Sequence, residues 1–173
     1  MTNPGEKAAV HLVVMGVAGC GKSSLGQALA QSLGVPLVEG DAFHPRENIE
    51  KMRSGMPLTD ADRAGWLDAL AQQLALHTEG AVLSCSALKL AYRHRLRTAV
   101  IGLRFVYLEL AREAALQRVA QRGAAHIFPA SLVDSQFAAL EPPLGEPLVL
   151  ALDALQPTAD QVGAVGRWLA RTA

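Results

Sequence analysis

One stretch decides the fold of this chain, Gly16-Val17-Ala18-Gly19-Cys20-Gly21-Lys22-Ser23. It fits G-x-x-x-x-G-K-[ST], a pattern whose glycines let the backbone turn tightly and aim its N–H groups at an anion. The apolar run 9–15 before it is typical of a strand buried on both faces, and residues 23–33 after it repeat leucine and alanine at helical spacing until Gly34. A strand, a glycine loop and a helix therefore follow one another in the order that a nucleoside triphosphate site requires.

Each residue of this loop has a predicted task in holding the phosphates. The N-terminus of the following helix is positively polarised, so the loop N–H groups and Lys22 surround the β- and γ-phosphates, and the Ser23 hydroxyl ligates Mg²⁺. A glycine-rich turn with an unrelated lysine is the alternative, but it leaves the flanking strand and helix unexplained. The predicted ATP-binding residues of the loop are Gly16, Val17, Ala18, Gly19, Cys20, Gly21, Lys22, Ser23 and Ser24.

Composition limits the classes of protein to which this chain can belong. Its 173 residues are 50% hydrophobic, enough for one well-buried core, so we expect a single domain. Lys plus Arg and Asp plus Glu both number 16, which gives no basic excess for nucleic acid or a membrane surface and favours a small partner. The two cysteines make neither a disulfide framework nor a metal cluster. Because no signal-like or membrane-spanning segment occurs, the sequence predicts a cytoplasmic protein.

Strand-like and helix-like segments alternate along the rest of the chain. Further strands are predicted at 36–39, 81–85, 103–108 and 148–152. Helices are predicted from Thr59 onward, over 88–97 and 111–122, and at 158–171, and the first of these has a cap-like start. The alternation indicates an α/β fold with a five-stranded parallel sheet covered by helices on both faces. Ligands bind such sheets beyond the carboxyl ends of the strands, so polar residues there are candidates for the site.

The first polar strand end is Glu39-Gly40-Asp41-Ala42-Phe43-His44. Side chains alternate in an extended segment, so Glu39 and Asp41 are expected on the same side. One carboxylate then serves Mg²⁺ and the other accepts a proton from an attacking hydroxyl, the division of labour that phosphoryl transfer needs. A solvated loop whose acids cap the next helix is the alternative. His44 fits a structural hydrogen bond and a substrate contact equally well.

Two clusters of positive charge follow further along the chain. Lys89 and Arg93 lie four residues apart, hence on one helical face near a strand end, where they suit an anionic substrate; ordinary solvated charge is the alternative. Arg118 and Arg122 show the same spacing before small residues that end at Pro129. This pattern predicts a mobile lid over about residues 118–130 that closes its arginines over the transferring phosphoryl group. An arginine pair placed there by the helix dipole is the alternative.

Taken together, these motifs resemble the small bacterial gluconokinases. The resemblance covers about residues 9–155 in the same order. It rests on Met15–Ser23, Glu39-Gly40-Asp41, His44–Met52, Gly55–Arg63, Trp66-Leu67, Cys85–Lys89 with Tyr92-Arg93, and Ser135–Phe137 with Leu140-Glu141. It implies ATP- and Mg²⁺-dependent phosphorylation of D-gluconate to 6-phospho-D-gluconate by a homodimer. It also implies a three-layer P-loop NTPase fold with a small lid, as in shikimate kinase.

The resemblance further implies roles for individual residues. Glu39 becomes a magnesium ligand beside Ser23, and Asp41 becomes the group that orients or deprotonates the substrate hydroxyl. With Asp41, the implied catalytic residues are Lys22 and Arg122. The residues that border the nucleotide beyond the loop are Arg118 and Pro157. Those that grip the polyol and its carboxylate are Asp41, His44, Lys51, Arg63, Lys89 and Arg93.

Alternatives remain open at this level. The family's lid has a compact Gly-His-Phe after its arginine, whereas residues 123–128 are longer and apolar. A kinase for another small hydroxy acid, such as shikimate, also fits the loop and the strand-end acids. A regulatory module that binds ATP without catalysis fits the loop alone. A GTPase switch is disfavoured, because the chain has no Asn-Lys-x-Asp motif.

Overall fold

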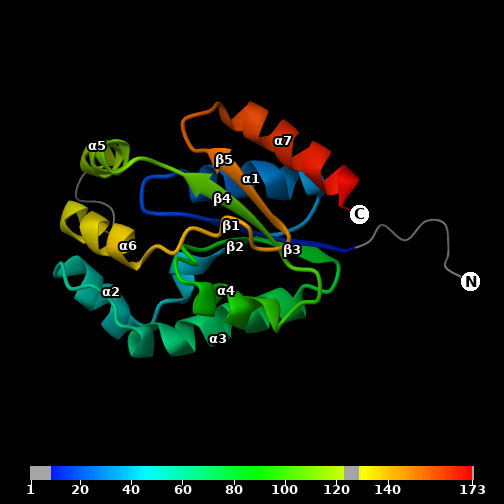
Figure 1. The fold of residues 1–173 in the computed structure, drawn as a ribbon. Coiled ribbons are helices and arrows are strands. Elements are labelled where there is room, and N and C mark those ends of the chain that lie inside the picture. The colour runs from blue at the N-terminus through cyan, green and yellow to red at the C-terminus, as the bar shows by residue number, and fades with distance from the viewer. Residues whose placement is uncertain (1–8, 123–128, 173) are drawn as a thin grey trace, which may run out of the picture.

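A computed structural model describes residues 9–122 and 129–172 of the chain. Within these residues the chain forms a five-stranded sheet in the order β2-β3-β1-β4-β5, with every neighbouring pair parallel (Figure 1). The strands are β1 (Val10–Met15), β2 (Leu37–Glu39), β3 (Gly80–Ser84), β4 (Arg104–Glu109) and β5 (Val149–Asp153). The predicted α/β fold with a five-stranded parallel sheet is confirmed.

Helices account for most of the other described residues. The α-helices are α1 (Lys22–Leu33), α2 (Arg46–Arg53), α3 (Asp60–Leu76), α4 (Leu90–Arg97), α5 (Arg112–Arg122), α6 (Val133–Ala139) and α7 (Thr158–Arg171). Two 3₁₀ helices, η1 (Gly40–Phe43) and η2 (Ala130–Leu132), complete the set. The helices predicted from sequence are all present, whereas α2 and α6 were not predicted.

The central strand shows why the sheet is buried on both faces. Leu12 and Val14 of β1 pack into one apolar cluster with residues of α1 and α7, while Val13 and Met15 pack into a second cluster with residues of α3 and α4. All four side chains are fully buried. Because neighbouring residues in a strand point to opposite faces, each pair anchors a separate helical layer. The result is the three-layer arrangement seen in Figure 1.

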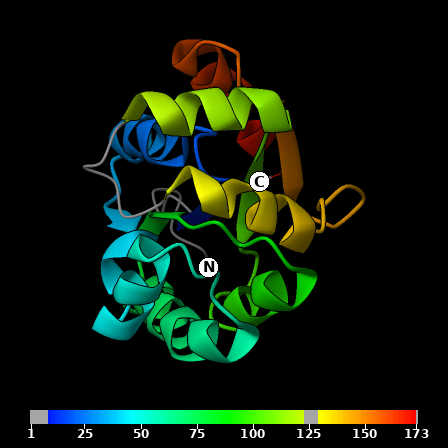
Figure 2. The same ribbon diagram turned by 90° about the vertical axis from the view of Figure 1, so that its left-hand side faces the viewer.

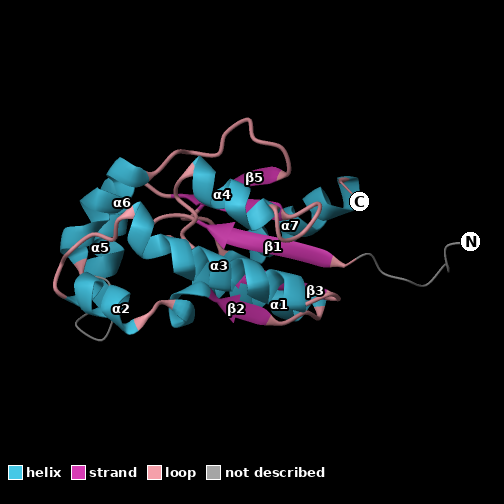
Figure 3. Ribbon diagram, turned by 90° about the horizontal axis from the view of Figure 1, so that it is seen from below, coloured by secondary structure: helices cyan, strands magenta, loops and turns pink. Residues whose placement is uncertain are grey.

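Three helices gather at the carboxyl ends of the strands instead of covering the sheet. The strand arrows point toward α2, α5 and α6 in Figures 1 and 3. Helices α5 and α6 lie against one another, as Figure 2 shows from the side. A space bounded by these helices and by the loop after β1 is therefore the place where parallel sheets bind ligands.

The start of α3 follows the sequence closely. Thr59 accepts a hydrogen bond from the Asp62 N–H at 3.1 Å, and the Asp62 carboxylate accepts one from the Thr59 N–H at 2.9 Å. This reciprocal capping box satisfies two N–H groups that a helix terminus otherwise leaves unpaired, and such a cap stabilises a helix by about 1 kcal/mol. The predicted cap-like start is confirmed, and it fixes where α3 begins beside the strand ends.

The predicted lid lies only partly within the described residues. Arg118 and Arg122 belong to α5, while residues 123–128 lie outside the described part of the chain. The lid therefore stays a prediction. Among the helices of the described residues, none has the length and hydropathy needed to span a bilayer.

Candidate active site

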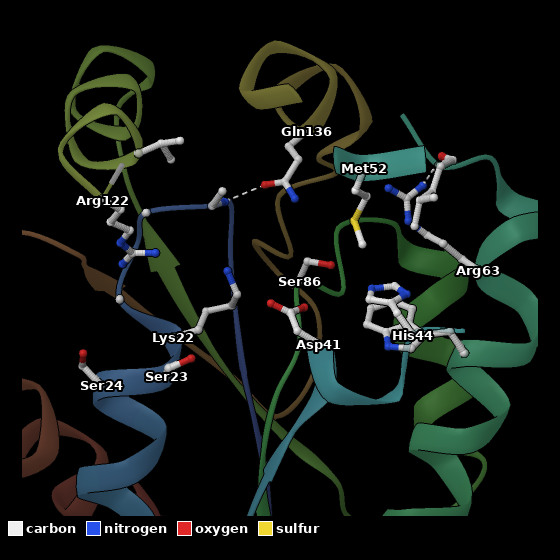
Figure 4. A pocket seen from close by; sticks show the side chains of 16 residues that line it. Lys22, Ser23, Ser24, Asp41, His44, Met52, Arg63, Ser86, Arg122 and Gln136 are labelled. Carbon is white, nitrogen blue, oxygen red and sulfur yellow. Dashed lines mark hydrogen bonds between the residues drawn. The ribbon is translucent and has the colours of Figure 1, made fainter. Parts of the chain in front are cut away.

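A cavity of about 370 Å³ lies at the carboxyl ends of the strands (Figure 4). The loop after β1 forms one wall, η1 with α2 and α3 forms the opposite wall, and α5 and α6 contribute side chains from above. Its lining residues are Ala18, Gly19, Gly21, Lys22, Ser23, Ser24, Asp41, His44, Met52, Leu58, Arg63, Trp66, Ser86, Val119, Arg122 and Gln136. Elements far apart in the sequence thus share one cavity.

The glycine loop is held in place by its neighbours on several sides. Gly16 has a φ of +147°, and a Cβ there would stand 2.8 Å from the carbonyl oxygen of Leu108, so only glycine fits. Its N–H donates to the Ser86 carbonyl, and Arg118 Nη1 donates to the Gly19 carbonyl at 3.1 Å. These contacts hold the loop from the segment after β3 and from α5, and they fix its path beside α1.

Lys22 extends from this loop into the cavity. Its Nζ donates to the Val17 carbonyl at 3.1 Å within the same loop, and its side chain points into the same space as the carboxylate of Asp41 (Figure 4). A Lys ammonium carries three N–H donors; a second one lies 3.9 Å from Cys20 Sγ, so one remains for a phosphate oxygen. The loop motif predicts this position for its lysine, which reaches the β- and γ-phosphates of a bound nucleotide.

A hydroxyl and a carboxylate meet beside the first turn of α1. The Ser23 hydroxyl donates to Glu39 Oε2 at 3.1 Å, and Glu39 is the last residue of β2. Mg²⁺ prefers such oxygen ligands and takes only one or two from the protein when phosphates and waters supply the rest. Among the described residues, no group of three or more His, Cys, Asp or Glu side chains is placed to hold a metal. The donor set therefore fits a magnesium ion shared with a nucleotide.

Asp41 reaches the cavity by a route that differs from the predicted one. The chain is extended only as far as Glu39, and Gly40 begins the 3₁₀ helix η1, so strand alternation does not relate the two acids. A Cβ at Gly40 would lie 2.4 Å from the Ser84 carbonyl oxygen, because η1 crosses directly over β3. Trp66 Nε1 also donates to the Gly40 carbonyl at 2.8 Å. These contacts fix the backbone that presents Asp41 to the cavity.

His44 stands on the opposite side of the cavity as a neutral ring. It stacks on Trp66 with a centroid separation of 4.2 Å. Burial lowers the pKa of His44 to about 4; the Asp41 charge opposes the shift, and the Arg63 charge adds to it. The Asn48 amide nitrogen donates to the Asp62 carbonyl and lies 3.4 Å from His44 Nδ1, which therefore accepts, so the ring proton is assigned to Nε2.

Arg63 supplies a guanidinium to the same wall. Its Nη1 donates to the Leu58 carbonyl, and its Cζ lies 5.8 Å from the centre of the Tyr92 ring. No ion pair involves Arg63 within the described residues. The remaining donors and the full positive charge are thus available to an anion in the cavity.

Two predicted substrate lysines lie outside the cavity lining. Lys51 Nζ pairs with Asp62 at 2.7 Å, and Lys89 Nζ pairs with Asp60 at 2.8 Å. The Lys51 hydrogen bond lowers the pKa of the Asp62 carboxyl to about 2. Both lysines therefore join α3 to neighbouring segments, Lys51 from α2 and Lys89 from the residue before α4.

Arg93 is also outside the cavity, and its surroundings oppose a contact with substrate. The residue is fully buried, and its guanidinium donates to the carbonyls of Ala87, Leu88 and Glu141 and to the Glu146 carboxylate. Guanidinium has five N–H donors, and these contacts use all of them. The spacing of four residues placed Arg93 on one helical face with Lys89, but Arg93 points inward and connects the segment before α4 to the segment between α6 and β5.

A second cavity of about 370 Å³ shares the glycine loop with the first. It is lined by Gly19, Cys20, Gly21, Ser24, Arg118, Gln121, Arg122, Ala154, Gln156, Thr158 and Gln161. Pro157 is the N-cap of α7 and lies between two of these residues in the chain. Arg118 also donates to the Ala154 carbonyl, and Arg122 borders both cavities. The glycine loop therefore forms a bridge between two adjoining spaces.

The structure also identifies cavity residues for which the sequence predicted no role in binding. Trp66, Ser86 and Gln136 stand within motifs of the family resemblance, but none of them was assigned to the site. The Gln136 side chain accepts a hydrogen bond from the Ala18 N–H at 2.6 Å, across 118 residues of sequence (Figure 4). No local pattern signals such a contact, because it depends on how α6 packs at the strand ends.

Known proteins resemble this chain over most of its length. A family model described as an AAA domain matches residues 12–143. A gluconokinase of Gluconobacter oxydans is 48% identical over 136 residues, which cover 76% of this chain and 75% of the relative. The thermoresistant gluconokinase of Escherichia coli is 40% identical, covering 84% and 85%. The crystal structure of a gluconokinase from Sinorhizobium meliloti 1021 superposes with a TM-score of 0.86 at 45% identity, covering 96% and 95%.

Proposed function

Because the chain belongs to the gluconokinase family, we propose that this kinase transfers the γ-phosphoryl group of ATP to D-gluconate and forms 6-phospho-D-gluconate. One observation carries the proposal beyond the family relationship. Asp41 lines the same cavity as Lys22 and Ser23 of the glycine loop, while Arg63 faces them from α3. A phosphate cradle, an acid and an unpaired cation in one space are the parts that phosphoryl transfer to an anionic acceptor needs.

The acceptor occupies the side of the cavity formed by η1 and α3. Its carboxylate pairs with Arg63, whose planar donors match carboxylate oxygens, and its hydroxyls meet the Nε2–H of His44. Asp41 accepts the proton of the attacking hydroxyl. That oxygen forms a bond to the γ-phosphorus while the bond from phosphorus to the β,γ-bridging oxygen breaks, and ADP leaves.

The glycine loop and α5 hold the donor. The loop N–H groups, Lys22 and the Arg122 guanidinium surround the phosphates, and the second cavity takes the adenosine beside Arg118 and Pro157. Ser23 and Glu39 would hold Mg²⁺, which would neutralise phosphate charge. The short link between the two cavities supports a single ATP that spans both.

The fold around the site supports catalysis over passive nucleotide binding. A regulatory ATP module needs the loop, but it has no use for a carboxylate presented across the cavity from the loop lysine. A kinase for another hydroxy acid such as shikimate is the second candidate, because Arg63 pairs with any carboxylate. The two differ in the acceptor, which a direct assay separates.

Release of ADP, measured with gluconate, shikimate, glucose and glycerate as acceptors, tests the proposal. We expect the highest kcat/KM with gluconate and a phosphorus NMR signal of a primary phosphate ester in the product. A Lys22→Ala variant is the control, since it removes the loop ammonium and should abolish turnover with every acceptor. Equal rates with all four acceptors would refute the assignment of gluconate.

We propose further that the protein is a cytoplasmic homodimer. The dimer rests on the resemblance to the family, and light scattering of the purified protein tests it. The cytoplasmic location is supported by its two cysteines, Cys20 and Cys85, which are both unpaired and buried and suit a reducing compartment. Neither nucleic acid nor a membrane is proposed as a partner, because acidic and basic residues balance at 16 each.

A further inference from the structure

Gln136 joins the helix α6 to the glycine loop. Its side-chain Oε1 accepts the hydrogen bond from the Ala18 N–H at 2.6 Å, and its amide lines the cavity. Ala18 is the third residue of the loop and directly precedes Gly19. Gln136 is itself 9% exposed. A buried amide thus stands directly against the part of the loop that faces the acceptor.

This hydrogen bond settles which way the amide points. A backbone N–H is only a donor, so the atom that faces Ala18 must be the amide oxygen. The amide nitrogen then lies on the other side, and Figure 4 shows it directed into the cavity, toward Ser86. Within the described part of the chain Nε2 makes no hydrogen bond, although Oε1 is bonded. Two N–H donors are therefore presented to the cavity contents.

Contacts of the residues before and after Gln136 in the chain hold α6 in place. Leu132 and Val133, before it in the chain, are buried in apolar clusters. After α6, the Glu141 N–H donates to the Leu88 carbonyl at 2.9 Å, and the buried Arg93 donates to the Glu141 carbonyl at 2.9 Å. The donors consequently have little freedom to reorient, and a preorganised donor stabilises developing charge more effectively than a mobile one.

We propose that Gln136 is a catalytic residue whose Nε2–H group donates to an equatorial oxygen of the transferring phosphoryl group. The inference rests on the proposed kinase reaction. The transition state spreads its negative charge over the three equatorial oxygens of the phosphoryl group, and Figure 4 shows the Gln136 amide directed into the cavity that Lys22 and Asp41 also enter. In this role Gln136 donates a hydrogen bond, but it transfers no proton and forms no covalent bond. Gln136 Oε1 meanwhile accepts from the Ala18 N–H. One side chain thus contacts the phosphoryl group and also holds the glycine loop.

The test replaces Gln136 by methionine, which keeps the length of the side chain and removes both its donors and the oxygen that accepts from Ala18. We expect kcat to fall about 10²- to 10³-fold, the loss typical of one removed transition-state donor. The Kd for ADP alone should change less than about threefold, because the ground-state complex barely uses the donor. The Kd for ADP with aluminium fluoride, Mg²⁺ and gluconate, which mimics the transferring group, should rise at least about tenfold.

The Gln136→Glu variant separates this role from a structural one. Glutamate keeps an oxygen that accepts from the Ala18 N–H but offers no donor at neutral pH. We expect it to be as inactive as the methionine variant, with an unchanged thermal unfolding midpoint. Near-normal turnover of Gln136→Glu would overturn the proposal, because holding Ala18 would then be the whole role. A parallel loss of affinity for ADP and for ADP with aluminium fluoride in Gln136→Met would overturn it too.

Two controls keep the outcomes distinct. Gln72→Met changes an exposed glutamine of α3 that lines neither cavity, and it should leave kcat and both affinities unchanged. Failure of the wild-type protein to phosphorylate gluconate would count against the proposed function. An active wild type whose kcat survives in Gln136→Met would count against Gln136 alone.

Discussion

Arg63 and Arg93 have the same side chain, both were predicted to grip the substrate, and they occupy opposite environments. Arg63 lines the cavity, donates to one backbone carbonyl and has no ion pair within the described residues. Arg93 is fully buried and gives all five donors to carbonyls and to Glu146. Arg63 therefore keeps N–H donors that an anion in the cavity could use, whereas Arg93 has none left.

The same contrast divides the lysines. Lys22 reaches into the cavity with contacts only to its own loop and no carboxylate partner among the described residues, whereas Lys51 and Lys89 are paired with aspartates of α3. Asp60 holds Lys89 and also accepts from the Tyr92 hydroxyl, so these groups connect α3 to α4. Within the described residues, the cations Lys22 and Arg63 of the cavity lining have no carboxylate partner, whereas Lys51, Lys89 and Arg93 outside it do. The predictions below test that division.

The largest expected effect is on Asp41, the one acid among the residues that line the first cavity. Asp41→Asn removes the proton acceptor and should lower kcat about 10²- to 10⁴-fold while the Kd for ATP stays within about threefold. Initial-rate kinetics and nucleotide titration measure the two quantities. Asp68→Asn is the matched control, since Asp68 is exposed and pairs with Arg95 outside both cavities. Near-normal turnover of Asp41→Asn would exclude it as the base.

Arg93→Met should mainly affect stability. Burial raises the pKa of the Glu146 carboxyl, but hydrogen bonds from Arg93 and then Arg97 together keep it below its usual range. Removing Arg93 leaves a largely buried carboxylate with one partner, which should cost about 3 kcal/mol of unfolding free energy. Denaturant unfolding measures this loss, with the exposed Arg95→Met as control. A stable variant with a greatly raised KM for gluconate would instead place Arg93 in the site.

His44 gives a pH-dependent effect of intermediate size. Its folded pKa of about 4 lies below the ordinary 6.5, so the unfolded chain binds a proton that the folded protein does not between these values. The contribution of neutral His44 to the free energy of unfolding is therefore complete above about pH 6.5, and it is lost progressively as the pH falls toward 4. NMR titration of the His44 ring carbons should give a midpoint near 4. A midpoint near 6.5 would show that the stack on Trp66 does not bury the ring.

The smallest effect is expected for Lys89→Met. Its ion pair with Asp60 is largely exposed, and solvent screening makes the contribution of such a pair to stability small. The KM for gluconate should stay within about twofold of the wild-type value. Steady-state kinetics at several gluconate concentrations checks this. A KM for gluconate raised more than tenfold would show that Lys89 contacts the substrate.

The sequence predicts the sheet well because its signals are local. The glycine loop, the buried runs and the cap at Thr59 each depend on a few neighbouring residues, and the predicted strands agree with the observed ones to within a residue or two. Helix α2 was not predicted because only two of its eight residues, Asn48 and Met52, are buried, which leaves almost no apolar period. Helix α6 is shorter still, with seven residues.

The site was harder to predict because tertiary contacts decide which polar residues line the cavity and which are already hydrogen-bonded elsewhere. Spacing of four residues put Lys89 and Arg93 on one helical face, but it carries no information on whether the donors are already used. Gln136 meets Ala18 only because α6 packs above the strand ends. Asp41 was found from its position after a strand, although η1 and not strand alternation presents it. Sequence motifs thus predict where the cavity lies, whereas the hydrogen bonds and ion pairs formed on folding decide which side chains have groups left to bind a ligand there.

The most direct test of this account compares two acceptors in wild type and Arg63→Met. The kcat/KM values are measured for gluconate and for D-glucitol, which carries a hydroxymethyl group in place of the carboxylate. If the unpaired guanidinium reads the carboxylate, Arg63→Met should lower kcat/KM for gluconate roughly 10- to 150-fold, the worth of one charged hydrogen-bonded contact, and leave the value for D-glucitol within about twofold. Equal losses for both acceptors would contradict the account, because Arg63 would then shape the cavity without recognising the charge.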